Sequence, residues 1–347
     1  YDADFLDYVA FLCSTGEVDP VACNTPAPAG FGVTPIDPSD LNLASIGIEA
    51  LAGQQTVTRE VTNIGPTGTY TVSVAAPAGI SVSVNPSTLA VAKGQTATYT
   101  VTFTTQAGAV TDQWAFGSLT WADGAGHAVR SPLAVRPVAL SAPDEFTGTG
   151  TSGSGSWEVT FGASGAFTAD PLGLVPATTT AGTVVDDPAN DINVALGTGD
   201  GITAHTIAVT EGTEHLRVSL FDESTDGADD LDLYLFGPDG SYVDGSGSAT
   251  SAEQVDASKP AAGNWTVIVH GWQTDGADAS YTLFSWQVPP AAAGNLGVTA
   301  PAVATVGQQG DIEIAWTDLT SGTRYMGAVR YTNGTSEIDR TLVTITA

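Results

Sequence analysis

Apolar and polar residues alternate along most of this chain, but its first residues follow a different pattern. Between Asp4 and Cys13 the apolar residues recur at the spacing of one helical face, and Gly16 then ends the pattern. After Pro38 the period changes to two, and six segments are predicted strands: 56–62, 70–74, 81–84, 96–103, 117–121 and 128–135. Gly, Pro and Asn residues separate them at the intervals typical of β-sandwiches. The pattern predicts an all-β protein of tandem β-sandwiches with one short N-terminal helix.

The predicted strands group into several domains. Residues 1–38 hold the helix and a loop, and residues 39–140 hold one β-sandwich of about 100 residues. The strands in 141–185 and in 296–347 are too few to close a sandwich in either segment alone, whereas 186–295 is long enough for a complete β-domain. We therefore expect 141–185 and 296–347 to pair as one split sandwich, with 186–295 inserted between them. Two independent small subdomains are the alternative.

The charge balance limits the partners of the protein. Its 347 residues include 38 acidic and 9 basic side chains, for a formal net charge of −29. A surface of that sign repels phosphate groups, so neither nucleic acid nor an anionic membrane surface is an expected partner. No apolar run approaches the roughly 20 residues of a membrane helix, so no membrane span is expected. The first residues lack a basic segment followed by an apolar stretch, so no signal peptide is expected among them.

Two runs of oxygen-bearing side chains occur in the segment predicted to be inserted. The runs at 186–191 and 222–232 supply these candidate metal ligands: Asp186, Asp187, Asn190, Asp191, Asp222, Asp226, Asp230 and Asp232. The pleat of a strand places Asp230 and Asp232 on one face and the intervening leucines on the other. Two such carboxylates repel each other unless a cation lies between them, and a set of oxygen ligands without Cys or His selects Ca²⁺. The alternative is a solvated acidic face that keeps the protein soluble.

The two cysteines, Cys13 and Cys23, close a short loop just after the predicted helix. In an oxidising compartment such a pair commonly forms a disulfide, which contributes about 3 kcal/mol or somewhat less. A zinc site is a poor alternative because the chain has no other cysteine and the nearest histidine is His127. A disulfide would indicate a secreted protein.

Aromatic residues and histidines give weaker signals. Trp265, Trp272 and Tyr234 could bind a substrate by stacking, although core packing is the commoner role of such residues. The four histidines are His127, His205, His215 and His270. None accompanies a glycine-flanked serine in a strand-to-helix turn, so no catalytic residue is predicted.

The first 137 residues resemble the C-terminal region of subtilisin-like serine proteases (subtilases), especially the large plant type. The matching runs include YDADFLDYVAFLC (1–13), TVTREVTNIG (56–65), APAGISVSVNPSTL (76–89) and FGSLTWADGAGHAVRSPLAVR (116–136). In those enzymes the helix follows the catalytic domain, and a fibronectin type III-like sandwich comes next. The resemblance implies the same order of elements here.

Residues 186–288 resemble a bacterial pre-peptidase C-terminal (PPC) domain, a small β-sandwich or jelly roll. The matching runs are DDPAND (186–191), DLDLYLFGPDG (230–240), PAAGNWTVIVHG (260–271) and ASYTLFSW (279–286). Domains of this family trail secreted proteases, and some bind Ca²⁺. They are implicated in secretion, in stabilising the enzyme or in holding bulky substrates, and the resemblance implies such a role.

Together the two resemblances imply a non-catalytic C-terminal accessory region of a secreted subtilisin-like serine endopeptidase, stabilised by Ca²⁺. The catalytic Asp, His and Ser of that family lie upstream of the segment matched by Tyr1, so none of them maps onto this sequence. The expected partners are the catalytic domain of the same precursor and an insoluble protein substrate. The alternative is a Ca²⁺-dependent binding module or adhesin for an insoluble protein or polysaccharide.

Overall fold

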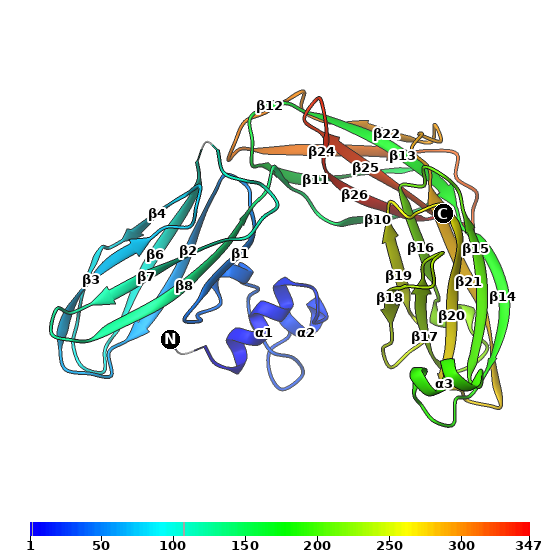
Figure 1. Cartoon of the computed structure of the whole chain (residues 1–347), viewed down its shortest axis with the longest axis horizontal. Helices are drawn as coiled ribbons and strands as arrows, with labels where there is room; N and C mark the ends of the chain where they lie inside the picture. The colour runs from blue at the N-terminus through cyan, green and yellow to red at the C-terminus, as the bar shows by residue number, and fades with distance from the viewer. Residues whose placement is uncertain (2, 107) are drawn as a thin grey trace. The chain divides into compact units, whose positions relative to one another are not determined.

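The computed structural model describes residues 1, 3–106 and 108–347. The chain divides into two compact units, each built from more than one stretch of sequence. Unit 1 comprises Tyr1–Ala142, Glu158–Ala166 and Ala302–Gly310. Unit 2 comprises Pro143–Trp157, Phe167–Pro301 and Asp311–Ala347. Figure 1 labels most of the helices and strands of both units.

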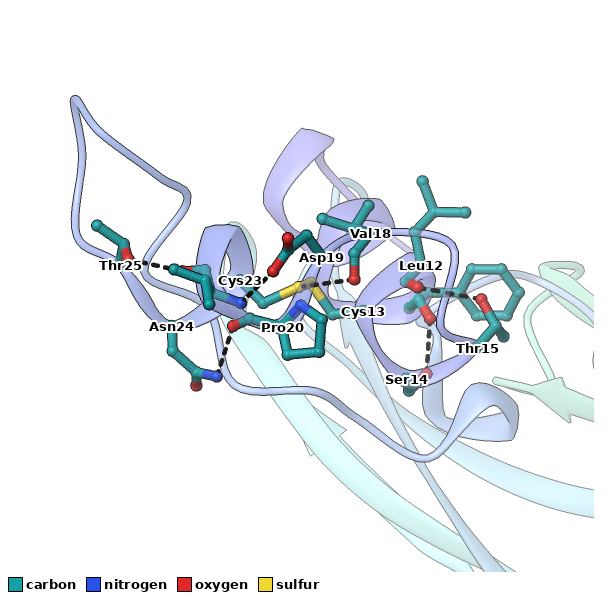
Figure 2. The surroundings of a disulfide bond; sticks show 12 residues. Leu12, Cys13, Ser14, Thr15, Val18, Asp19, Pro20, Cys23, Asn24 and Thr25 are labelled. Atoms are coloured by element: carbon teal, nitrogen blue, oxygen red, sulfur yellow. Dashed lines mark hydrogen bonds between the residues drawn. A yellow bond between two sulfur atoms is a disulfide. The ribbon is translucent and has the colours of Figure 1, made fainter. Parts of the chain in front are cut away.

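The chain begins with two short helices joined by a disulfide. Helix α1 (Phe5–Ser14) is capped by Asp4, whose carboxylate accepts from the backbone N–H groups of Leu6 and Asp7. Helix α2 (Pro20–Asn24) starts with a proline, which is favoured in the first helical turn. Figure 2 shows the bond between Cys13 and Cys23 that connects the two helices. Both the predicted N-terminal helix and the predicted disulfide are confirmed.

The first β-sandwich belongs to unit 1 and follows the 3₁₀ turn η1 (Pro38–Asp40). One sheet has the strand order β1 (Ile46–Leu51), β8 (Ala128–Pro137), β7 (Ala115–Ala122), β3 (Gly68–Ala75) and β5 (Thr88–Val91). The other has the order β2 (Gln54–Thr62), β6 (Thr96–Thr105) and β4 (Ile80–Asn85). The six predicted strands are present, and β1 and β5 are additional. Both are short, and β1 has the burial pattern buried–exposed–buried–exposed–exposed–buried, which weakens the alternation that identifies a strand.

The central sandwich of unit 2 packs two four-stranded sheets. One has the order β14 (Thr178–Val185), β21 (Asp278–Val288), β16 (His215–Ser219) and β19 (Gln254–Ser258). The other has the order β15 (Ile202–Val209), β20 (Gly263–Gln273), β17 (Asp230–Phe236) and β18 (Tyr242–Ser246). Helix α3 (Ile192–Thr198) and the 3₁₀ turn η2 (Asp222–Ser224) complete it. Side chains of both sheets, among them Leu233, Val267 and Leu283, share one core.

The flanking sandwich combines strands from before and after the central sandwich. One sheet has the order β10 (Glu145–Thr149), β26 (Glu337–Thr346), β25 (Arg324–Thr332) and β13 (Thr168–Pro176). Another has the order β22 (Leu296–Thr299), β24 (Gln309–Trp316), β11 (Gly153–Phe161) and β9 (Leu140–Ser141). Strands β12 (Gly165–Ala166) and β23 (Val303–Ala304) form a two-stranded ribbon. Strands β11 and β24 each contribute residues to both units.

The structure differs from the expected domain limits at one strand. We assigned residues 178–185 to the split sandwich, but β14 pairs along its whole length with β21 of the central sandwich. The reason is that β14 needs a partner for its backbone groups, and the eight residues from Asp278 to Ser285 provide a continuous antiparallel ladder. The strands of the flanking sandwich therefore end at Pro176 before the central sandwich begins.

Candidate metal centre

Strand β17 presents leucines and carboxylates on opposite faces, as the pleat predicts. Leu231, Leu233 and Leu235 are fully buried in the core of the central sandwich. Asp230 and Asp232 occupy the other face, where Asp232 is only 5% exposed. These carboxylates lie outside the apolar core but are largely shielded from solvent. The side chains that form hydrogen bonds with them therefore determine what this face can bind.

Two neighbouring carboxylates keep an oxygen without any partner. Oδ2 of Asp229 and Oδ1 of Asp230 are both buried and have no hydrogen bond among the described residues. The other oxygen of Asp229 accepts from the backbone N–H of Asp275 at 3.0 Å. Burial, followed by the charges of Asp232 and Glu253, raises the pKa of Asp230. Unsatisfied oxygens with repelling neighbours cost free energy unless a cation compensates them.

His270 on β20 joins the two acidic runs. Its ring is fully buried, with Nε2 3.0 Å from Oδ2 of Asp187 and Nδ1 3.2 Å from Oδ2 of Asp232. Burial alone would lower the pKa of His270, but the hydrogen bonds to Asp232 and Asp187 outweigh it, so the pKa is raised. A protonated ring donates through both nitrogens. His270 therefore compensates Asp187 and Asp232, and leaves Asp230 without such a partner.

The rest of the 186–191 run folds against the end of β20. The backbone N–H of Thr274 donates to Oδ1 of Asp186 at 3.0 Å. The side-chain amide of Asn190 donates to the carbonyl oxygen of Trp272. Asp191 caps α3 by accepting from the first turn of that helix. These contacts place the run beside the loop that carries Asp229, because that loop also contacts the residues after β20.

The two earlier predicted ligands of the second run, Asp222 and Asp226, make different contacts. Asp226 accepts from the backbone N–H of Ser280 at 2.7 Å, and this hydrogen bond is the main reason why the pKa of Asp226 is lowered. Asp222 is exposed in η2, and within the described ranges no hydrogen bond links its carboxylate to the other candidates. His270 thus joins Asp187 and Asp232, and the adjacent N–H groups of Thr274 and Asp275 join Asp186 and Asp229. Asp222 and Asp226 make none of these contacts among the described residues.

The donor chemistry of this corner fits Ca²⁺. Among the described residues, no three His, Cys, Asp or Glu side chains are already grouped as a metal site. The oxygens of Asp229 and Asp230 without partners are nevertheless hard donors, and Asp186 has a second oxygen beyond the one that binds Thr274. Calcium takes six to eight such oxygens in flexible geometry. The residues of this corner therefore fit a hard cation by the chemistry of their donors, although the described side chains do not yet surround one point.

Three residues of this corner did not appear among the predicted ligands. Asp229 lies within the second acidic run, so the run itself was a sufficient signal for it. Asp275 lies in the acidic β20–β21 hairpin, where its carboxylate accepts from the backbone N–H of Ala228. The sequence around His270 does not predict its role, because a histidine in an apolar strand gives no indication of which carboxylates contact its ring.

Of the three aromatic residues that could stack on a substrate, Trp265 packs in the core instead. Its ring is 5% exposed within the core of the central sandwich, and its indole N–H donates to the carbonyl of Ala261 at 2.8 Å. The apolar area of the ring stabilises the fold and is closed to a ligand. Tyr234 is half-buried and donates to Asp232 at 3.3 Å. Trp272 is 38% exposed, so it alone of the three candidates presents substantial area to solvent.

A second set of charged residues joins the central sandwich to the flanking sandwich; we call this contact the joint. Four ion pairs cross it: Arg217–Glu145, Arg340–Glu214, Lys259–Glu337 and Arg324–Glu223. An apolar cluster lies between the two sandwiches, and Val288 and Met326 in it are fully buried. A buried apolar centre accompanied by polar pairs is the arrangement of a stable protein interface. Within unit 2 the joint therefore fixes one sandwich on the other.

Comparison with known proteins identifies two domains. Residues 40–135 match the fibronectin type-III domain, and residues 203–271 match the bacterial pre-peptidase C-terminal domain. Subtilisin-like protease SBT3.16 of Arabidopsis thaliana is 40% identical over 147 residues, which are 39% of this chain and 18% of the relative. Subtilisin-like protease SBT2.6 of the same plant is 35% identical over 136 residues, or 38% of this chain and 16% of the relative. The chain thus spans less than a fifth of these relatives.

The secreted serine protease VesC from Vibrio cholerae aligns with 70% of this chain and 48% of its own, at 10% identity. Its TM-score of 0.22 is too low to establish a common fold. No helix in the described part of the chain is both long enough and apolar enough to cross a membrane.

Proposed function

We propose that this chain is the non-catalytic C-terminal accessory region of a secreted subtilisin-like serine endopeptidase. The observation that carries the proposal is the order of the matches: the similarity to subtilisin-like proteases covers 39% of the chain, and the pre-peptidase C-terminal domain lies beyond the fibronectin type-III domain. The disulfide between the first two helices supports an oxidising, extracellular setting. Peptide-bond hydrolysis would belong to a catalytic domain in the same precursor.

The first helix supports a role in stabilising that catalytic domain. Val9 and Ala10 of α1 are buried, but Phe5 is 69% exposed, and Leu6 and Tyr8 are nearly half exposed. An amphipathic helix normally buries such residues, so this face is suited to a partner. In the proposed precursor the partner is the catalytic domain that precedes the helix.

Calcium is the proposed cofactor of the central sandwich. Asp229 and Asp230 would be its principal ligands, because each keeps a buried oxygen without a hydrogen bond among the described residues, and the second oxygen of Asp186 would join them. The bound ion would give Asp230 a direct cationic partner, because the hydrogen bonds of His270 go to Asp187 and Asp232 and its charge acts on Asp230 only through space. It would raise the apparent stability of the domain by mass action, about 2.7 kcal/mol at a concentration 100 times the dissociation constant.

Thermal unfolding with millimolar Ca²⁺ or with EGTA tests the calcium site. A peptidase assay on the same sample tests the non-catalytic accessory role. We expect the melting temperature of unit 2 to rise by several degrees with Ca²⁺ and no peptide to be cleaved. Mg²⁺ at the same concentration is the matched control, because it prefers a smaller octahedral site. Equal melting with and without Ca²⁺ would refute the metal site, whereas cleavage in a clean sample would refute the accessory role.

A second candidate function is binding to an insoluble polymer, and the exposure of Trp272 favours it. Trp272 is near the end of β20, and its ring lies edge-on to that of His270, with 6.0 Å between the ring centroids. A pull-down on collagen, keratin and chitin, with Trp272→Ala as the variant, tests this role. Loss of binding at an unchanged melting temperature would support it, and absence of binding by the unaltered chain to all three polymers would exclude it.

A further inference from the structure

A cavity of about 430 Å³ lies at the joint between the central and flanking sandwiches. Arg217, Ser219 and Phe221 line it from the central sandwich, and Thr147 and Thr149 of β10 line it from the flanking one. Its size is within the range of known ligand pockets, about 300–1,000 Å³, and such pockets favour interfaces between domains. The cavity is separate from the candidate metal centre, since they share no residue.

Arg217 gives the cavity a donor that the fold does not use. Its side chain is only 5% exposed, with Nε donating to Asp256 at 2.8 Å and Nη1 donating to Glu145 at 2.9 Å. The third nitrogen, Nη2, has no acceptor among the described residues, yet it is not one of the fully enclosed atoms. The side chain lines the cavity, so Nη2 is the donor of this guanidinium that remains for a ligand there. A ligand that enters can accept hydrogen bonds from a guanidinium that is already fixed in place.

Strand β10, which lines the cavity through Thr147 and Thr149, is at the edge of its sheet. In its sheet β10 is a terminal strand, paired in parallel with β26 on one side and with no strand on the other in the described residues. Thr147 and Thr149 on this strand are exposed. The free edge of a sheet offers backbone N–H and C=O groups that an extended peptide can pair with.

The other contents of the cavity argue against a sugar or a simple anion. A sugar ring stacks on an open aromatic face, but Trp286 is 4% exposed, and the guanidinium of Arg324 covers the ring of Phe221 at 3.8 Å. An anion would meet the carboxylates that already contact the two arginines, Glu145 and Asp256 at Arg217 and Glu223 at Arg324. Neutral carbonyl oxygens avoid both problems.

From these observations we infer that the cavity binds an extended, uncharged peptide segment. Backbone groups of the peptide would pair with the open edge of β10, and a carbonyl oxygen of the peptide would accept from Nη2 of Arg217. The site would let this region hold a polypeptide without any exposed aromatic platform. The inference concerns unit 2 alone and does not depend on the proposed calcium site.

The test is a titration of the full 347-residue chain with a blocked hexapeptide of alternating valine and threonine, followed by calorimetry and by NMR shift mapping. We expect binding no weaker than about 1 mM, with shifted resonances on β10 and around Arg217. Thr147→Lys and Thr149→Lys should each weaken binding about fivefold or more, because an edge lysine blocks strand pairing. Both positions are exposed, so the variants should keep the melting temperature of the unaltered chain.

Thr180→Lys is the matched control, because Thr180 is an exposed threonine on β14, which is also a terminal strand of its sheet. It should bind the peptide as the unaltered chain does. The inference is overturned if the peptide does not bind at millimolar concentration, if all three variants lose binding equally, or if cellohexaose or citrate displaces the peptide from the joint.

Discussion

The two ends of β21 show how the same acidic sequence is compensated in two different ways. Near Val288, at the joint, Glu145, Asp256 and Glu337 each contact an arginine or lysine. Near Asp278, at the candidate metal centre, no basic side chain other than His270 contacts the carboxylates within the described ranges. The chain has only nine basic residues, and four of them form ion pairs across the joint.

This difference indicates which carboxylates are structural and which are available to a ligand. A carboxylate that is buried and paired stabilises the fold, and removing its partner leaves an uncompensated charge. A carboxylate that is buried without a partner destabilises the fold until a cation arrives. Neutralising a charge should therefore have opposite effects at the two ends of the central sandwich.

The largest expected effect is at the joint. Arg217→Met keeps most of the side-chain volume but removes the charge between Glu145 and Asp256, so we expect unit 2 to lose about 3–5 kcal/mol of stability. Urea unfolding followed by tryptophan fluorescence measures the loss. Arg136→Met is the control, because Arg136 is 29% exposed and its carboxylate partners lie at 3.3 and 4.0 Å. A loss at Arg217 no larger than that control would show that the ion pairs of Arg217 do not hold the joint.

A smaller effect of opposite sign is expected at the metal centre. In EGTA, Asp230→Asn removes a charge that burial and the neighbouring carboxylates Asp232 and Glu253 disfavour, so the chain should become more stable by roughly 1 kcal/mol. The same variant should lose most of the stabilisation by Ca²⁺. Asp200 is an exposed aspartate of the same sandwich. Asp200→Asn should change neither the stability in EGTA nor the stabilisation by Ca²⁺. Destabilisation by Asp230→Asn in EGTA would contradict the absence of a partner for this carboxylate.

The sequence was informative where a feature depends only on residues close by in the chain. The alternation in β17 placed Asp230 opposite the leucines, and the short loop between two cysteines with no other zinc ligand nearby favoured a disulfide. It was uninformative where the outcome depends on a distant segment. Nothing near His270 reveals that Asp187, 83 positions earlier, reaches its ring. The burial of Trp265 and the pairing of β14 with β21 likewise follow from how the two sheets pack, and the pairs across the joint join residues up to 126 positions apart.

The smallest expected effect is a pH dependence of stability at Glu337. It tests whether the joint depends on charge. Burial would raise the pKa of Glu337, but hydrogen bonds from Lys259 and Arg340 outweigh it and lower the pKa. A carboxylate with a lowered folded-state pKa stabilises the fold above its unfolded value, near 4.3, and this stabilisation is lost as the pH falls through the folded-state value. Above pH 5, Glu337→Gln should therefore be less stable than the unaltered chain by up to about 1 kcal/mol, because Lys259 is more than half exposed and the pair is partly screened.

That difference should shrink steadily below pH 4, because protonation of Glu337 in the unaltered chain reproduces the neutral side chain of the variant. Urea midpoints of both proteins from pH 6 to pH 3 measure it, and Glu313→Gln, an exposed glutamate on β24, provides the baseline. A difference that is constant with pH would assign the contribution of Glu337 to packing. A difference that grows as the pH falls would mean that its folded-state pKa is raised, and that the joint, like the other end of β21, contains a carboxylate without sufficient compensation.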